Sequence, residues 1–277
     1  MKKSQPIGIF DSGVGGLGIF KKIAQLLPNE DLIYIGDTQN CPYGEKTIEE
    51  LQQITANILN FLITNHDIKI AVIACNTAST TCLDFLREHF TIPIIGVVPA
   101  VKPACELTKT KQIAILGTSR TVNSSYQKKL IEQFATDKKI NVLSVACPDL
   151  VTFIEKGELE GPQVEKKLSE YLTPVIQNNV DVVGLSCTHF PFLIKQIKKL
   201  LPKDTIIVDS NEAVAKQVVR VLSTFPPEMI SKLEHKPKYT VYSTKDFKSF
   251  ETVAKKLISD GDFSKLCTLI NWEPLKI

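Results

Sequence analysis

The sequence lacks any apolar run approaching the roughly 20 residues that a helix needs to cross a bilayer. Its first residues, MKKSQPIGIFDSG, reach the charged Asp11 too early for the apolar segment of a signal peptide. The formal net charge is only +3, and the lysines are scattered, which gives little attraction to nucleic acid or to membrane surfaces. We therefore expect a cytoplasmic protein with no nucleic-acid and no membrane partner.

Cysteine pairs at metal-ligand or redox spacing are also absent. The sequence contains no C-x-x-C pair, and its four histidines do not cluster with cysteines at zinc-ligand spacing. The seven cysteines are odd in number and widely spaced, which argues against a disulfide framework in an intracellular chain. We therefore expect reduced thiols and no metal site.

Short apolar runs rich in isoleucine and valine alternate with helical patterns along most of the 277 residues. The runs are apolar throughout, which indicates strands covered on both faces. Alternation of strands and helices predicts an α/β fold with parallel sheets and right-handed crossovers. The runs are PIGIFDSG, DLIYIGDT, IKIAVIACNT, IPIIGVV, KQIAILGTS, INVLSVACPD, VDVVGLSCTH and TIIVDS.

These eight runs form two groups of four with matching features. In the first group one strand ends at Asp11 and a later one at Cys75. In the second group one strand ends at Thr118 and a later one, after a similar interval, at Cys187. The match predicts two similar α/β units. Residues 199–227 and the tail KYTVYSTKDFKSFETVAKKLISD are typical of a helix, a linker and a further strand–helix unit, which could pack on either unit.

Polar residues gather where the strands are expected to end, and ligands of parallel α/β sheets bind beyond that edge. Cys75 and Cys187 each end an apolar run and are followed at once by hydrogen-bonding residues, where a packing cysteine would continue the apolar run. This favours a catalytic pair over two buried inert thiols, which remain the alternative. The polar clusters are Asp11-Ser12, Asp37-Thr38, Cys75-Asn76-Thr77 and Cys187-Thr188-His189.

The remaining cysteines fit other roles. Cys82, Cys105 and Cys267 have apolar or helical neighbours and are expected to pack in the interior. Cys41 and Cys147 precede prolines in expected loops, and Cys41 could approach a cleft.

Two opposed thiols suit the inversion of an amino acid at its α-carbon, because one base must remove a proton from one face while an acid delivers a proton to the other. A thiol has a pKa of about 8.5, which a positive neighbour or a helix N-terminus lowers, so it can hold either role near neutral pH. His189 is placed to tune Cys187, and Asp11 could serve Cys75. His189 could equally be a hydrogen-bonded structural residue.

The carbanion formed in such a reaction needs oriented hydrogen-bond donors. Backbone amides at the helix starts after Asn76-Thr77 and after Thr118 could bind a carboxylate, and Asp11 or Asp37 could accept from the substrate ammonium group. Each serine or threonine could instead be a helix cap. The side-chain donors expected here are Ser12, Asn76, Thr77, Thr118, Thr121 and Thr188.

A glycine-rich loop offers a competing interpretation. Residues 13–18, GVGGLG, fit G-x-G-x-x-G between a strand and a helix, with Asp37 about 20 residues further on, as in a dinucleotide-binding fingerprint. Against it, Asp11 places a carboxylate where a pyrophosphate would approach, and the fingerprint explains neither cysteine. The alternative is that the glycines permit a tight turn and close helix packing.

Four stretches, in order and at the family's spacings, resemble the signature regions of the glutamate racemase family: IGIFDSGVGGLGIFKKI, YIGDTQNCPYGEKT, VIACNTAST and GLSCTHFPFL. The resemblance covers nearly the whole chain. It implies two pseudo-symmetric, Rossmann-like α/β domains, residues 1–98 plus 210–277 with Cys75 and residues 99–209 with Cys187, and an active site in the cleft between them. It implies no pyridoxal phosphate, no other cofactor and no metal, with D-glutamate supplied to peptidoglycan synthesis.

The resemblance also implies roles for single residues. Cys75 would take the proton from D-glutamate and Cys187 the proton from L-glutamate, with Asp11 and His189 assisting. The family pattern is broken at Ser186, usually glycine, at Phe190, usually tyrosine, and at Gln39-Asn40-Cys41. The implied substrate contacts are Asp11, Ser12, Tyr43, Gly44, Asn76, Thr77, Thr118, Thr121, Glu155, Thr188 and His189.

Two other functions stay open from the sequence. One is an aspartate racemase or a broader amino-acid racemase with the same chemistry. The other is a non-catalytic nucleotide- or amino-acid-binding protein that uses the Gly13–Gly18 loop. The expected partner is a small molecule, L- or D-glutamate, and a homodimer is an alternative to a monomer.

Overall fold

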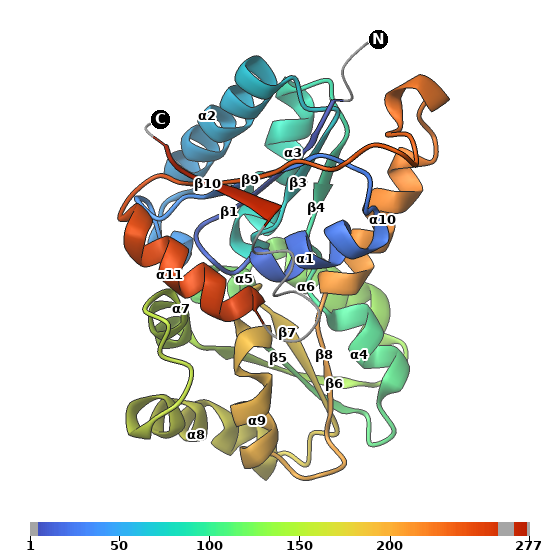
Figure 1. Cartoon of the computed structure of the whole chain (residues 1–277). Helices are drawn as coiled ribbons and strands as arrows, with labels where there is room; N and C mark the ends of the chain where they lie inside the picture. Colours follow the sequence, from blue (N-terminus) through green and yellow to red (C-terminus); the bar gives the residue numbers. More distant parts are fainter. Residues whose placement is uncertain (1–4, 260–268, 276–277) are drawn as a thin grey trace. The chain divides into compact units, whose positions relative to one another are not determined.

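The computed structural model describes residues 5–259 and 269–275. The chain divides into two compact units, unit 1 (Met1–Val97 with Asn211–Ile277) and unit 2 (Val98–Ser210). Each unit is a parallel sheet with helices packed on it (Figure 1), so the predicted α/β class with parallel sheets is confirmed.

The sheet of unit 1 has six strands within the described residues, in the order β10-β9-β2-β1-β3-β4, and every neighbouring pair is parallel. Its central strands are fully buried, as their unbroken apolar runs predict. The strands are β1 (Ile7–Asp11), β2 (Leu32–Gly36), β3 (Ile70–Ile73), β4 (Ile94–Gly96), β9 (Tyr239–Ser243) and β10 (Ile270–Pro274).

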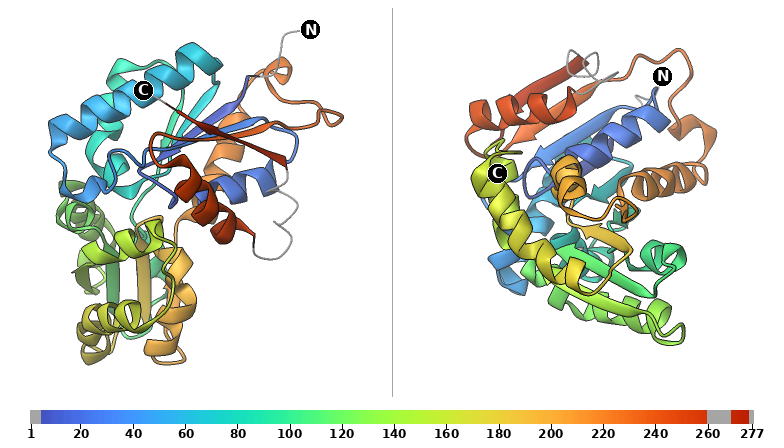
Figure 2. Two further views of the ribbon diagram at one scale, coloured as in Figure 1. Left: turned by 60° about the vertical axis from the view of Figure 1, so that its left-hand side comes forward. Right: turned by 90° about the horizontal axis from the view of Figure 1, so that it is seen from below.

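Helices cover both faces of this sheet (Figure 2): α2 packs on α3, while α1 packs on α10 and α11. The start of α2 is fixed by a capping box, in which Thr47 and Glu50 satisfy each other's backbone amides. The helices are α1 (Leu17–Leu26), α2 (Ile48–His66), α3 (Asn76–His89), α10 (Asn211–Leu222) and α11 (Phe247–Ile258), with short helical turns η1 (Tyr43–Glu45) and η4 (Pro227–Met229).

The sheet of unit 2 has four strands in the order β6-β5-β7-β8. The order matches β2-β1-β3-β4 in unit 1: in both units the second strand in the chain lies beside the first, and the third and fourth lie on the other side of the first. The predicted similarity of two four-strand groups is therefore confirmed by their topology. The strands are β5 (Gln112–Gly117), β6 (Asn141–Ala146), β7 (Val182–Ser186) and β8 (Ile206–Val208).

Two groups of helices pack around this second sheet: α4 contacts α6, and α8 contacts α7 and α9. The helices are α4 (Val101–Leu107), α5 (Ser119–Asn123), α6 (Ser125–Ile131), α7 (Pro148–Glu155), α8 (Pro162–Gln177) and α9 (Ile194–Leu200), with η2 (Glu132–Thr136) and η3 (Phe190–Leu193).

One expectation about the strands is wrong. The runs that form β6 and β8 are partly exposed, because both strands lie at the edges of the second sheet. The further strand expected in the tail is β9, which pairs with β2 in the first sheet, and β10 extends that sheet beyond β9. β10 escapes prediction because its sequence, INWEP, contains two polar residues and a proline and does not form an apolar run.

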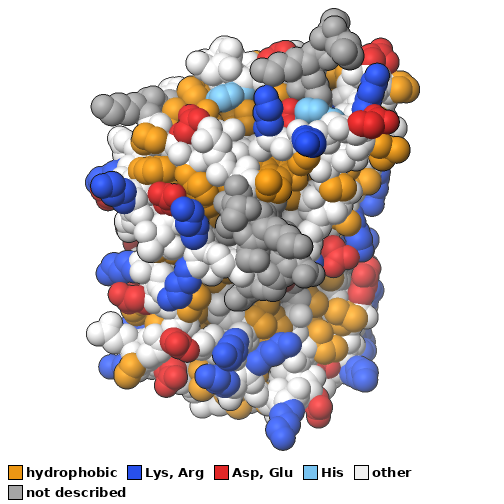
Figure 3. Space-filling model, viewed as in Figure 1, with side chains coloured by type: hydrophobic (Ala, Val, Ile, Leu, Met, Phe, Trp, Pro, Cys, Tyr) orange, Lys and Arg blue, Asp and Glu red, His pale blue; other side chains and the backbone are white. Residues whose placement is uncertain are grey.

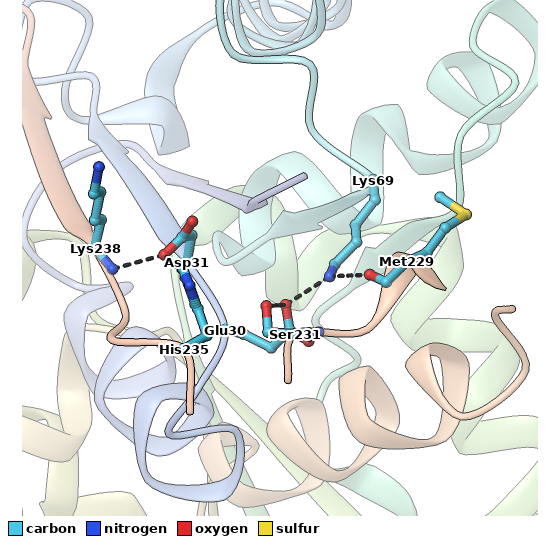
Figure 4. Close-up of polar contacts among 7 residues, drawn as sticks. All are labelled: Glu30, Asp31, Lys69, Met229, Ser231, His235 and Lys238. Carbon is cyan, nitrogen blue, oxygen red and sulfur yellow. Dashed lines mark hydrogen bonds and ion pairs between the residues drawn. The ribbon is translucent and has the colours of Figure 1, made fainter. Parts of the chain in front are cut away.

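The segment that joins α10 to β9 is held to the rest of unit 1 by partly buried polar contacts (Figure 4). Lys69 Nζ lies 2.6 Å from Glu30 Oε2 and donates to the backbone oxygen of Met229, also at 2.6 Å. Ser231 donates its backbone N–H to Glu30 at 2.9 Å, and His235 pairs with Asp31 at 2.8 Å. These contacts answer where the tail packs: β9 and α11 belong to unit 1.

On the face shown in Figure 3, basic and acidic side chains are interspersed. No described helix combines the length and the apolar character that crossing a membrane requires.

Candidate functional site

In unit 1 the sheet has a topological switch point at β1, because β2 lies on one side of β1 and β3 lies on the other. Ligands of open α/β sheets bind at such a switch point, beyond the carboxyl ends of the strands. Asp11 ends β1, and Cys75 follows β3 and precedes the first turn of α3. The structure brings these predicted residues together: Cys75 Sγ lies 4.0 Å from Ser12 Oγ, and Ser12 Oγ lies 3.5 Å from Asp11 Oδ1.

Asn76 is the first residue of α3 and is 3% exposed. Its Nδ2 is a buried donor with no hydrogen-bond partner in the structure. A buried amide without a partner costs free energy, and such an orphan in a native protein calls for an explanation. Beside the Cys75 thiol and at a helix N-terminus, a carboxylate ligand would satisfy it.

The glycine loop between β1 and α1 is packed against the strands. Gly13 donates its backbone N–H to Asp11 Oδ1 at 2.9 Å, and Tyr34 donates its hydroxyl to the Gly13 oxygen at 2.6 Å. A Cβ on Gly16 would lie 2.8 Å from the Cβ atoms of both Ala74 and Asp11. The backbone N–H of Gly13 is already bonded to the Asp11 carboxylate, so it is not available to a pyrophosphate. This favours the interpretation that the glycines serve a tight turn and close packing.

Asp37, at the carboxyl end of β2, is 1% exposed and already surrounded by donors. Tyr43 Oη donates to Oδ2 at 2.7 Å, Thr244 Oγ1 donates to Oδ1 at 2.9 Å, and Asn40 Nδ2 contacts both oxygens at 3.1 and 2.9 Å. A carboxylate offers about four acceptor sites, and three protein groups already contact this one. Asp37 is therefore held firmly in place by the protein, and its role as an acceptor for the substrate ammonium group stays a prediction.

Tyr43 belongs to η1 and is 2% exposed, and the adjacent Gly44 is half-buried. Burial, followed by the charge of Asp37 and the hydrogen bond to it, raises the pKa of Tyr43 well above its ordinary value. The phenol therefore stays neutral and acts as a donor. The charges of Cys75 and Asp11 also raise the Tyr43 pKa, because both groups lie near the phenol.

In unit 2 the switch point lies between β5 and β7, and Cys187 directly follows β7. His189 Nδ1 lies 3.8 Å from Cys187 Sγ, and its Nε2 lies 2.5 Å from Oε1 of Glu155, the last residue of α7. Cys187, Thr188 and His189 are all buried. The imidazole of His189 thus lies between the Cys187 thiol and the Glu155 carboxylate and contacts both.

Opposing influences act on the His189 pKa. Burial lowers it, but the hydrogen bonds to Cys187 and Glu155 and the charges of both partners raise it, and the result lies well above the ordinary value. The imidazole is therefore held in its charged form, in which both ring nitrogens donate.

Other predicted residues have local partners in unit 2. Thr118 caps α5 by accepting the Thr121 amide at 3.2 Å, and their hydroxyls lie 3.0 Å apart. Thr118 thus acts as the helix cap that the sequence left open, at the same switch point as Cys187. Ser186 accepts the backbone N–H of Ala100 at 3.0 Å, so its hydroxyl, unusual for the family, has a structural partner.

The remaining described cysteines are thiols, and Cys267 lies outside the described residues. Cys82 and Cys105 pack in hydrophobic clusters. Cys41 is half-buried before a cis proline. Cys147 precedes Pro148 in the loop between β6 and α7, as expected, and is fully buried; burial followed by the charge of Cys187 raises its pKa.

Sequence reasoning missed Thr244 and the bonding role of Asn40. Thr244 is distant from Asp37 in the chain, and only the pairing of β2 with β9 brings them together. Asn40 is in the same loop as Asp37, and an asparagine three residues after a strand-end aspartate could have signalled a local hydrogen bond.

Comparison with known proteins agrees with this geometry. The model of the Asp/Glu/Hydantoin racemase family matches residues 7–218. A glutamate racemase of Herpetosiphon aurantiacus is 40% identical over 221 residues, covering 80% of this chain and 86% of that protein. A glutamate racemase isoform of Bacillus anthracis superposes with a TM-score of 0.84 at 34% identity, covering 99% of this chain and 98% of that one. The glutamate racemase of Francisella tularensis, solved with D-glutamate, has a TM-score of 0.81 at 29% identity, covering 99% and 97%. The chain therefore belongs to the Asp/Glu/hydantoin racemase family.

Proposed function

We propose that this protein interconverts L- and D-glutamate by two-base proton transfer without a cofactor, with Cys75 and Cys187 as the two bases. One observation carries the proposal: in each unit a buried thiol follows the third strand, at the switch point of a sheet with the same strand order. Two inert packing cysteines would have no reason to occupy equivalent positions in both units.

The proposed reaction moves one proton in and one proton out. Cys187, as a thiolate, takes the α-proton of L-glutamate and becomes a thiol, while the C–H electron pair passes to the α-carbon and its carboxylate. Cys75, as a thiol, gives its proton to the opposite face and becomes a thiolate. The D enantiomer runs through the same steps in reverse, with Cys75 as the base, so atoms and charge balance in both directions.

The substrate carboxylate needs hydrogen-bond donors as negative charge spreads onto it. The orphaned Asn76 Nδ2 and the backbone amides at the start of α3, with Thr77, would supply them beside Cys75. Ser12 and Thr188, with Tyr43-Gly44 and the Thr118–Thr121 turn, are proposed as further substrate contacts.

The partners of the two thiols differ, and so do their proposed roles. His189, charged and backed by Glu155, contacts Cys187 Sγ and is proposed to assist its proton transfers. Asp11 lies near Cys75 through Ser12, and its carboxylate is proposed to accept the substrate ammonium group or to guide the proton of Cys75. The catalytic set is thus Cys75, Cys187, Asp11 and His189.

The choice of glutamate rests on the relatives, since several family members above 30% identity are glutamate racemases and one neighbour binds D-glutamate. The product D-glutamate would supply peptidoglycan synthesis. Because the proposed bases work only as thiols, we also infer that the protein acts in a reducing compartment such as the cytoplasm.

Incubation with L-glutamate in deuterated water tests the proposal. The expected product is D-glutamate that carries deuterium at the α-carbon, detected by mass spectrometry after chiral separation. A parallel incubation with L-aspartate separates a glutamate racemase from an aspartate racemase. Absence of α-deuterated D-glutamate would refute the proposed activity.

A further inference from the structure

The loop that presents Tyr43 and Gly44 is attached to a strand from the far end of the chain. Thr244, directly after β9, donates its hydroxyl to Asp37 Oδ1 at 2.9 Å and accepts the backbone N–H of Gln39 at 3.0 Å. Its own backbone N–H bonds Gly36 at 3.2 Å. Thr244 therefore holds the last residue of β2, Gly36, and two residues of the loop that follows, Asp37 and Gln39.

A second connection lies beside the first. Thr38 Oγ1 lies 2.9 Å from Ser243 Oγ and donates to the Lys245 oxygen at 2.7 Å, while the Lys245 amide donates back to Thr38 at 2.9 Å. The carboxyl ends of β2 and β9 are thus joined by side chains as well as by the strand ladder.

The contact reaches the proposed substrate loop through Asp37. Its other oxygen accepts the Tyr43 hydroxyl at 2.7 Å, so Thr244 and Tyr43 hold one carboxylate from two sides. Tyr43 lies in one hydrophobic cluster with Cys75, and η1 contacts α3, the helix that begins directly after Cys75. A shift of Asp37 would therefore move the Tyr43-Gly44 backbone relative to the Cys75 thiol.

From these contacts we propose that Thr244 is a positioning residue for substrate binding, acting through Asp37 on the Tyr43-Gly44 loop; this rests on the proposed function. Asp37 positions the loop, because Thr244, Tyr43 and Asn40 all donate to its carboxylate. The hydrogen bonds of Thr244 go to Gly36, Asp37 and Gln39 and not to the Cys75 thiol. Its loss should therefore change how well the substrate is held and leave the proton transfers themselves intact.

The deciding variant is Thr244→Val, which keeps the side-chain shape and removes the hydroxyl. We expect KM for both enantiomers to rise about tenfold, the scale of one hydrogen bond to a charged group, while kcat changes less than about twofold. Thr244→Ser, which restores the hydroxyl, should return KM to within about twofold of the wild type. Thr252→Val is the matched control, because the Thr252 hydroxyl bonds only its own helix at Lys248, on the exposed side of α11.

Three results would overturn the inference: an unchanged KM in a folded Thr244→Val variant, a fall confined to kcat, or failure of Thr244→Ser to restore KM. If Thr244→Val does not fold, Asn40→Ala decides, because it removes a donor from the same carboxylate without touching β9. A raised KM in that variant supports the positioning role, and an unchanged KM refutes it. The wild-type protein is assayed alongside, so that absence of glutamate turnover in the wild type counts against the proposed function and not against this inference. Calorimetric binding of D-glutamate gives a readout that is independent of turnover.

Discussion

His189 Nε2 lies 2.5 Å from Glu155 Oε1, which places a carboxylate directly behind the imidazole that contacts Cys187. Glu155 ends α7, whereas His189 follows β7, so two different elements meet at this contact. The carboxylate fixes the ring orientation and favours the charged imidazole, much as a carboxylate orients the histidine of a catalytic triad.

Glu155→Gln should weaken this support. The variant removes a charge that raises the His189 pKa, so that pKa should fall. The alkaline limb of the pH–rate profile should then move to lower pH, because the imidazole loses its proton earlier as the pH rises. We expect kcat/KM to fall by about tenfold or more, equally for both enantiomers because they are equal in free energy in water. Glu158→Gln, at an exposed position after α7, is the control and should leave the profile unchanged.

Single-residue variants should distinguish the roles of the two thiols. Cys75→Ala retains Cys187, so in deuterated water it should slowly exchange the α-proton of L-glutamate without forming the D enantiomer. Cys187→Ala should show the reverse, with exchange confined to D-glutamate. Mass spectrometry of each recovered enantiomer measures this. Cys105→Ala, at a packing thiol of unit 2, should racemise normally, and equal exchange from both enantiomers in either single-thiol variant would contradict the assigned roles.

The buried ion pair of unit 1 should matter for stability. Lys69→Met leaves Glu30 buried without its positive partner, which should lower the free energy of unfolding by about 3–5 kcal/mol. Urea denaturation monitored by circular dichroism measures the change. The control is Lys102→Met, which breaks an exposed pair with Glu106 at 3.9 Å and should cost under about 1 kcal/mol. Similar losses in both variants would show that burial of the Lys69 pair is unimportant.

Gly16→Ala tests whether the glycine loop serves packing. Its new Cβ would approach the Cβ atoms of Asp11 and Ala74 to 2.8 Å, so the backbone must shift, at a cost of about 1–3 kcal/mol. Turnover should fall as well, because Asp11 moves with the loop. Gly18→Ala meets only the side-chain amide of Asn211, at 2.7 Å, and alanine is favoured in a helix, so it should be nearly neutral. Thermal melts and the racemisation assay compare the two, and a neutral Gly16→Ala would contradict the packing interpretation.

Much of the local structure was predictable from the sequence. Unbroken apolar runs indicated the buried strands β1, β3, β5 and β7, because strands covered on both faces need apolar side chains throughout. Edge strands were harder. β6 and β8 show apolar runs yet are partly exposed, and β10 has no such run, because an edge strand buries less of its surface and its pattern carries less information.

The sequence by itself determined where the buried strands end and which polar residues stand there, including the two cysteines and His189, because these follow from hydrophobic pattern and chain order. Only the tertiary structure decided that Glu155 stands behind His189 and that Thr244 fills an acceptor site of Asp37. Those contacts join residues far apart in the chain, and no local pattern of side chains encodes which distant hydroxyl or carboxylate the folding of the sheets brings within hydrogen-bonding distance.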